Sequence, residues 1–164
     1  MATNWQWIVP RLKAQGVTVT STTQLHNLGE IQQAADATLG AAEFIYLKGV
    51  ASTVVGTPVI YSTANYQTAL APVGANKPQP IAVAMSANVA NSYAWYQISG
   101  NAVGAKTSGL ALASNAAVGI LTAGKFAATG SGKEVIGALT LAKATVPTTV
   151  SLVLQRPRMQ GRIT

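Results

Sequence analysis

Short apolar runs, separated by glycine, proline, asparagine and serine, make up most of the chain. Runs of this length that are rich in β-branched and aromatic residues favour strands, and the breaks between them favour turns. The pattern predicts strands at residues 43–50, 57–62, 80–85, 92–99, 102–107, 118–122, 125–129, 135–142 and 148–155. Because such runs recur about every ten residues, we expect an all-β fold, an antiparallel sandwich or barrel of the jelly-roll-like kind.

Local signals refine this series of strands. Gly100-Asn101 predicts a hairpin turn between two of them, and Ala123-Gly124 predicts a second. Residues 29–38 are the best candidate for a helix, which would be short. The same stretch could instead be extended, because Ile31 is its one large apolar residue. We therefore expect at most one short helix in the chain.

The N-terminal residues stand apart from the β pattern. Trp5, Trp7 and Ile8 are large and apolar but precede any predicted strand, and Arg11 and Lys13 follow them. Exposed tryptophans lower solubility unless something covers them. Two interpretations stay open: the rings cover the chain's own core, or the segment is an extended arm that docks on a neighbouring subunit or on a partner.

The C-terminal residues are basic, with Arg156, Arg158 and Arg162 close together. They form either a solvated tail or an anchor for an acidic surface. We accordingly divide the chain into an N-terminal arm, a β-domain and a basic C-terminal tail, at residues 1–22, 23–155 and 156–164. The partner-binding residues that we expect lie in the arm and the tail: Trp5, Trp7, Ile8, Arg11, Lys13, Arg156, Arg158 and Arg162.

Composition narrows the function classes. The chain of 164 residues has 11 Lys and Arg against 4 Asp and Glu, a net charge of +7, and no cysteine. Only 9% of its residues are charged, whereas an ordinary soluble domain has roughly 25%. Disordered chains and coiled coils carry more charge than this. No apolar run approaches the ~18 residues that a membrane helix needs, so we expect no membrane partner.

Groups for catalysis are scarce as well. His26 is the sole histidine and Asp36 the sole aspartate, and no spacing typical of a metal site occurs. Gly119 to Lys125 matches the glycine and lysine positions of a phosphate loop, but Phe126 stands where the loop needs a hydroxyl. We expect no enzyme activity, no catalytic residue, no metal site and no cofactor.

Direct nucleic-acid binding is also disfavoured. The lysines are scattered along the chain and do not alternate with aromatic residues, as a base-stacking surface requires. Tyr93, Trp95 and Tyr96 share one predicted strand, with Tyr96 on the opposite face from the other two. We interpret this strand as part of the core, with Trp95 and Ile98 buried, and keep a nucleic-acid-binding barrel as a weaker alternative.

Residues 23–155 resemble a known family. The stretch TQLHNLGEIQQAADATLGAAEFIYLKGVASTVV, then GTPVIYS, then IAVAMSANVANSYAWYQISGNAVG, is similar to the decoration or cement proteins that coat the heads of tailed bacteriophages. Glycine-rich, charge-poor closing strands add to the likeness.

This resemblance implies a structural virion protein without enzymatic activity. Such a protein is made in the host cytoplasm and binds the outer surface of the assembled capsid. Its partners would be the major capsid protein and further copies of itself, as a homodimer or homotrimer at local symmetry axes. The alternative is another phage structural component, such as a tail, collar or spike-base β-domain.

Overall fold

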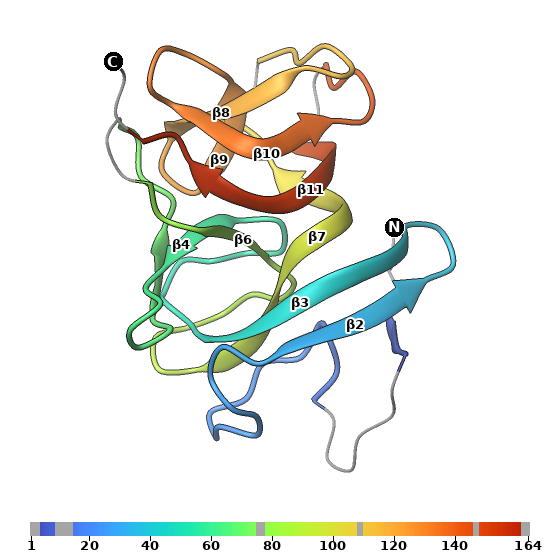
Figure 1. Cartoon of the computed structure of the whole chain (residues 1–164), viewed down its shortest axis with the longest axis vertical. Helices are drawn as coiled ribbons and strands as arrows, with labels where there is room; N and C mark the ends of the chain where they lie inside the picture. Colours follow the sequence, from blue (N-terminus) through green and yellow to red (C-terminus); the bar gives the residue numbers. More distant parts are fainter. Residues whose placement is uncertain (1–3, 9–14, 75–77, 108–109, 146–147, 162–164) are drawn as a thin grey trace.

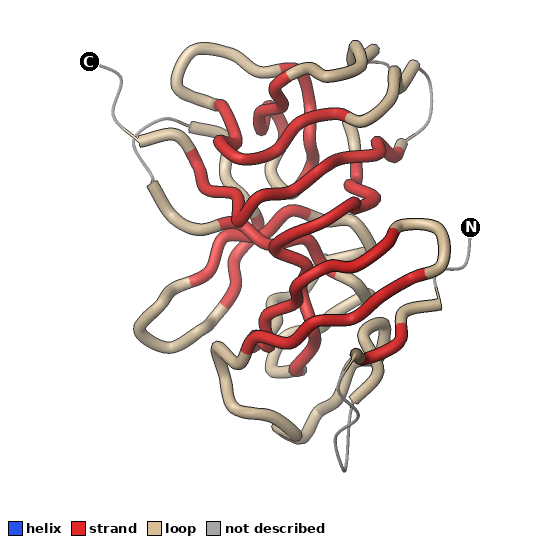
Figure 2. The backbone as a smooth tube through the Cα atoms, turned by 45° about the vertical axis from the view of Figure 1, so that its right-hand side comes forward, coloured by secondary structure: helices blue, strands red, loops and turns tan. Residues whose placement is uncertain are grey.

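The computed structural model describes residues 4–8, 15–74, 78–107, 110–145 and 148–161. These residues form strands joined by loops and turns, and no helix occurs among them (Figure 2). The strands are β1 (Gln6–Trp7), β2 (Ile31–Asp36), β3 (Gly40–Lys48), β4 (Pro58–Tyr61), β5 (Thr68–Leu70), β6 (Ile81–Ala84), β7 (Tyr93–Ala105), β8 (Ala117–Thr122), β9 (Lys125–Ala128), β10 (Glu134–Thr140) and β11 (Thr149–Met159) (Figure 1). The predicted all-β fold class is confirmed.

All of these strands belong to one branched sheet with antiparallel pairing. The main path runs β1-β2-β3-β7-β11-β10-β8-β9, and β4, β5 and β6 branch from β7. The sheet does not close into a barrel. It bends into two halves that meet at β7 (Figure 1), consistent with the sandwich alternative or a jelly-roll-like fold.

Strand β7 is shared by the two halves. Its first part pairs with β3 and β6, and its last part pairs with β11. Gly100 lies where the strand changes partners and has a φ of +90°. A Cβ atom there would lie 2.7 Å from the carbonyl oxygen of Ala41. The predicted hairpin at Gly100-Asn101 is therefore wrong, because the glycine bends a continuous strand instead of ending it.

The helix expected at residues 29–38 is also absent, since this stretch contains β2. Burial alternates along the strand: Gln32, Ala34 and Asp36 are buried, whereas Ile31 and Gln33 are exposed. The period of two is that of a strand. It escapes notice in the sequence because small and polar residues occupy the buried positions.

The remaining predictions of strands agree with the structure in outline. The hairpin at Ala123-Gly124 is confirmed, with Gly124 at a φ of +69° between β8 and β9. Strands β1 and β5 were not predicted. Strand β11 continues to Met159, beyond the domain boundary expected at residue 155, so Arg156 and Arg158 belong to a strand and not to a free tail.

The core has three apolar clusters. The first lies among β6, β8, β9, β10, β11 and the last part of β7. The second lies between the β3–β7 pair and the β4–β6 pair. The third covers the opposite face of β3 and β7. Residues 44–47 are buried on both faces: Phe44 and Tyr46 belong to the third cluster, and Ile45 and Leu47 belong to the second.

Candidate functional site

The tryptophans near the N-terminus lie on the chain's own third cluster. The ring of Trp5 meets Phe44 edge-on, with the ring centroids 4.9 Å apart. The ring of Trp7 meets Trp95 in the same manner at 4.8 Å. Both tryptophans are half-buried, and Trp95 is fully buried, as predicted. In the structure these rings thus cover the chain's own core, which is the first of the two interpretations.

Gln15 ties this segment to the sheet. Its backbone carbonyl oxygen accepts hydrogen bonds from the indole N–H of Trp7, at 3.3 Å, and of Trp95, at 3.1 Å. Its side-chain amide donates to the carbonyl oxygen of Tyr93 and accepts from the hydroxyl of Tyr46. Its backbone N–H donates to Nε2 of His26. Nothing in the sequence marks Gln15, because its role depends on neighbours that are far away along the chain.

The other residues expected in the arm contribute less. Ile8 is 50% exposed at the end of this segment. Arg11 and Lys13 lie outside the described residues, as does Arg162 near the C-terminus.

Arg156 bridges the two halves of the molecule. Its Nε donates to Oε2 of Glu43 at 3.1 Å, and its Nη2 donates to Oε1 at 3.2 Å. These hydrogen bonds and the charge of Glu43 raise the pKa of the guanidinium. The backbone of Arg156 has a φ of +45°, a conformation that costs free energy outside glycine. The strain lies opposite Gly137, where the register of β10 and β11 shifts.

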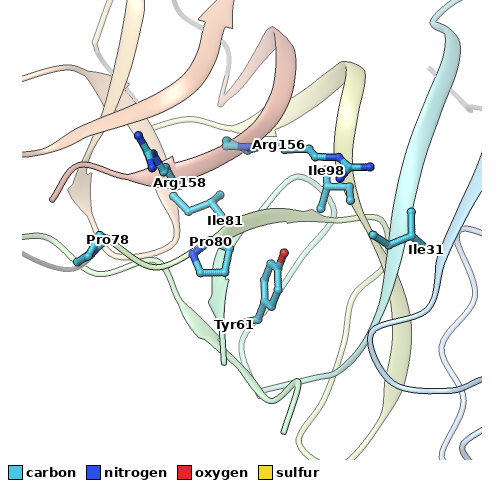
Figure 3. A pocket seen from close by; sticks show the side chains of 9 residues that line it. Ile31, Tyr61, Pro78, Pro80, Ile81, Ile98, Arg156 and Arg158 are labelled. Carbon is cyan, nitrogen blue, oxygen red and sulfur yellow. The ribbon is translucent and has the colours of Figure 1, made fainter. Parts of the chain in front are cut away.

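A groove of about 250 Å³ runs beside Arg156 (Figure 3). Arg156 and Arg158 from β11 lie along one side, and Pro80 and Tyr61 lie along the other (Figure 3). Ile98, in the floor of the groove, is buried. Burial raises the pKa of the Tyr61 hydroxyl, and the charge of Arg156 partly opposes this increase. The groove combines apolar walls with two guanidinium groups.

A second feature is an apolar row on the outer face of β7, β10 and β11. Leu139, Leu141 and Val103 are 45%, 41% and 38% exposed. The strand register sets Leu139 opposite Val153, and Ser151 opposite Val103. The backbone N–H of Leu141 donates to the carbonyl oxygen of Ser151, which places Leu141 in the same row as Val103. We call Val103, Leu139, Leu141 and Val153 the outer apolar face.

The described part of the chain holds no cluster of three or more His, Cys, Asp or Glu side chains placed to bind a metal ion. Within the same residues, no helix has the length and apolarity to cross a membrane. Comparison with protein-family models and with curated proteins gave no match.

Proposed function

We propose that this protein is a structural virion protein that binds the outer surface of an assembled phage capsid and holds neighbouring capsomers together. Its partners would be the major capsid protein and further copies of this chain. The observation that carries the proposal is the outer apolar face, because neighbouring apolar side chains exposed together on the surface of a folded domain mark an interaction site. The sequence resemblance supplies the identity of the partners.

The free energy that burial of the outer apolar face can contribute fits weak, repeated contacts. Burying a leucine or valine fully contributes about 1.5–3 kcal/mol, and each exposed member of the face still has roughly 40% of its surface to bury. The three exposed side chains, Val103, Leu139 and Leu141, together thus contribute about 2–4 kcal/mol before the costs of association. Bringing two free proteins together costs about as much or more, so one such contact does not hold a free dimer.

On a lattice, the same contact has a larger effect. A copy that is already attached to the capsid meets its neighbours at a high effective concentration, so a weak contact becomes effective. Binding that occurs only to the expanded shell stabilises that shell by mass action. A domain whose strands all pair in one sheet suits this task, because it presents the face without rearrangement.

The test is saturation of expanded heads prepared without this protein. We expect the purified chain to bind them in high copy number, measured by sedimentation, and to raise their melting temperature. The variant Leu139→Thr should bind more weakly. Leu25→Thr is the matched control, since Leu25 is 46% exposed and Leu139 is 45% exposed.

Two outcomes would contradict the proposal. Binding at only a few copies per head would favour a tail, collar or spike-base component. Failure to bind heads, together with log-linear salt dependence of DNA binding, would favour a nucleic-acid-binding protein.

A further inference from the structure

We infer that the groove beside Arg156 is a binding site for an extended peptide segment that carries a carboxylate side chain between apolar residues. The inference rests on the proposed function, because it gives the chemistry of the segment that a protein partner would insert. It also makes a claim of its own, since the groove can be tested with peptides in the absence of any capsid.

The floor and walls of the groove are apolar and rigid. Ile81 and Ile98 are only 1% and 3% exposed, and Pro157 is buried beside them. Pro78 and Pro80 form the wall across the groove from Arg156 and Arg158 (Figure 3). Proline fixes φ and cannot donate a backbone hydrogen bond. The walls therefore favour apolar side chains and lose little conformational entropy when a ligand binds.

The wall segment is also held in place by backbone hydrogen bonds. Pro80 forms a bridge with Arg158, and the N–H of Met159 donates to the carbonyl oxygen of Gln79 at 2.9 Å. The N–H of Tyr61 donates to the carbonyl oxygen of Pro80. These hydrogen bonds join residues 79–80 to β11 on one side and to β4 on the other, so the wall segment is positioned before any ligand arrives.

The guanidinium groups supply the charge. A guanidinium has five N–H donors, and Arg156 uses two of its own on Glu43. Arg158 is exposed and forms no ion pair with the described residues. Two arginines against one glutamate leave a net charge of +1 at the rim. Arginine recognises a carboxylate with two parallel hydrogen bonds, so this rim suits one acidic side chain.

The strained backbone of Arg156 supports a defined role for that side chain. A residue at a φ of +45° persists only where its surroundings hold it, and such residues cluster at binding sites. Here the pair with Glu43 anchors the guanidinium over the groove. The buried positions of β11 are even-numbered from Val150 to Leu154 and odd-numbered from Pro157 to Met159, so the irregularity at Arg156 is what leaves both arginines on the exposed side.

A peptide fits the groove better than a nucleic acid does. Binding single strands relies on aromatic rings on which bases stack, whereas Tyr61 is the one aromatic side chain among the described residues that line this groove. Glu43 at the rim would repel a chain of phosphates. A single carboxylate avoids most of that repulsion because it can bind on the side of Arg158.

The experiment uses isoleucine methyl groups as reporters. The full chain is labelled at its isoleucine δ1 methyls and titrated with the peptide acetyl-Val-Glu-Val-amide, which should bind in the millimolar range. We expect the NMR signals of Ile31, Ile81 and Ile98 to shift, since these residues line the groove. Ile120 lies in β8 and does not line the groove, so its signal should not shift. The matched peptide acetyl-Val-Gln-Val-amide should produce no comparable change.

Three variants test the arginines. Arg158→Gln should weaken binding of the glutamate peptide about threefold to tenfold. Lys143→Gln removes the same charge from an exposed position in the β10–β11 loop and should leave binding unchanged. Glu43→Gln should strengthen binding, because the amide oxygen can still accept a hydrogen bond from Arg156 while the competing negative charge is removed. Unchanged melting temperatures for Arg158→Gln and Lys143→Gln establish that these proteins remain folded.

Several results would overturn the inference. These are equal binding of the two peptides, equal loss of binding in Arg158→Gln and Lys143→Gln, or weaker binding in Glu43→Gln. Stronger shifts of the groove methyls with a thymidine oligonucleotide than with the peptide would assign the groove to nucleic acid.

The outcome is separable from that of the proposed function. If wild-type protein saturates heads but the groove binds no peptide, only the inference about the groove fails. If the groove binds the peptide but the protein does not bind heads, only the proposed function fails.

Discussion

Replacing Trp7 by alanine tests whether the N-terminal residues are part of the chain's own core. A buried aromatic side chain removes about 150–250 Å² from water, and Trp7 is half-buried, so we take roughly 120 Å². At ~25 cal/mol per Å² the loss is about 3 kcal/mol. The hydrogen bond to the carbonyl oxygen of Gln15 is long, at 3.3 Å, and adds little. We expect Trp7→Ala to lower the free energy of unfolding by about 3 kcal/mol.

The assay is urea unfolding at 25 °C, followed by far-ultraviolet circular dichroism. Ile8→Ala is the control from the same segment, since Ile8 is 50% exposed and should cost less than about 1 kcal/mol. The unfolding midpoint of the wild type should not depend on protein concentration.

Two results would refute this reasoning. If Trp7→Ala costs less than Ile8→Ala, the indole does not pack on the core in solution. If the midpoint rises with protein concentration, the segment packs on a second copy of the chain, because only an intermolecular contact gives such a dependence.

Three further predictions concern the fold. The pKa of Asp36 is lowered by hydrogen bonds from the backbone N–H groups of Leu39, Thr38 and Asn4. The ionised carboxylate therefore stabilises the fold at pH values above the ordinary aspartate pKa of 3.8, and this stabilisation is lost as pH falls through the lower pKa of the folded state. Melting temperatures measured between neutral and acidic pH should therefore fall less steeply for Asp36→Asn than for the wild type, and equal slopes would contradict this. Gly100→Ala should cost more than about 2 kcal/mol in urea unfolding, because its Cβ would meet Ala41 and Ala42, whereas Gly40→Ala has a similar φ and open space and should cost clearly less. Trp95→Ala should cost about 3–5 kcal/mol, and a melting temperature near that of the wild type would show that Trp95 is peripheral.

Most strands could be predicted because their apolar side chains enter a core. The residues 44–47 and 94–98 are rich in aromatic and β-branched types, and both groups are buried where β3 and β7 pair. Their burial on two faces could not be predicted, since it depends on β4 and β6 covering one face and on the N-terminal residues covering the other.

The errors have a common physical origin, which is tertiary context acting on weak local signals. Gln32 is buried in β2 and donates to Glu30, so a polar residue there does not mark an exposed position. Gly100 has the backbone freedom of a turn residue, but β7 uses it to change partners. Tertiary packing decides which of two permitted structures forms.

The candidate site was foreseen only in part. Arg156 and Arg158 were expected to bind a partner, but as members of a tail. The pairing of Arg156 with Glu43 spans 113 positions of the chain, and no local pattern reports such a distance. The outer apolar face was not foreseen, because Leu139 and Leu141 fall in the predicted strand at residues 135–142 and nothing in its pattern marks which side chains stay uncovered.

The shared strand β7 also determines how the molecule transmits mechanical force. A force that separates the two halves passes mainly along β7, because this strand pairs with β3 in one half and with β11 in the other. The hydrogen bonds of an antiparallel pair lie perpendicular to the strands, so a pull along β7 loads many of them together. A pull across the strand would instead open them one after another. Resistance to such forces is governed by the rate of unfolding and not by equilibrium stability. This resistance depends on the direction of the force, being higher along β7 than across it.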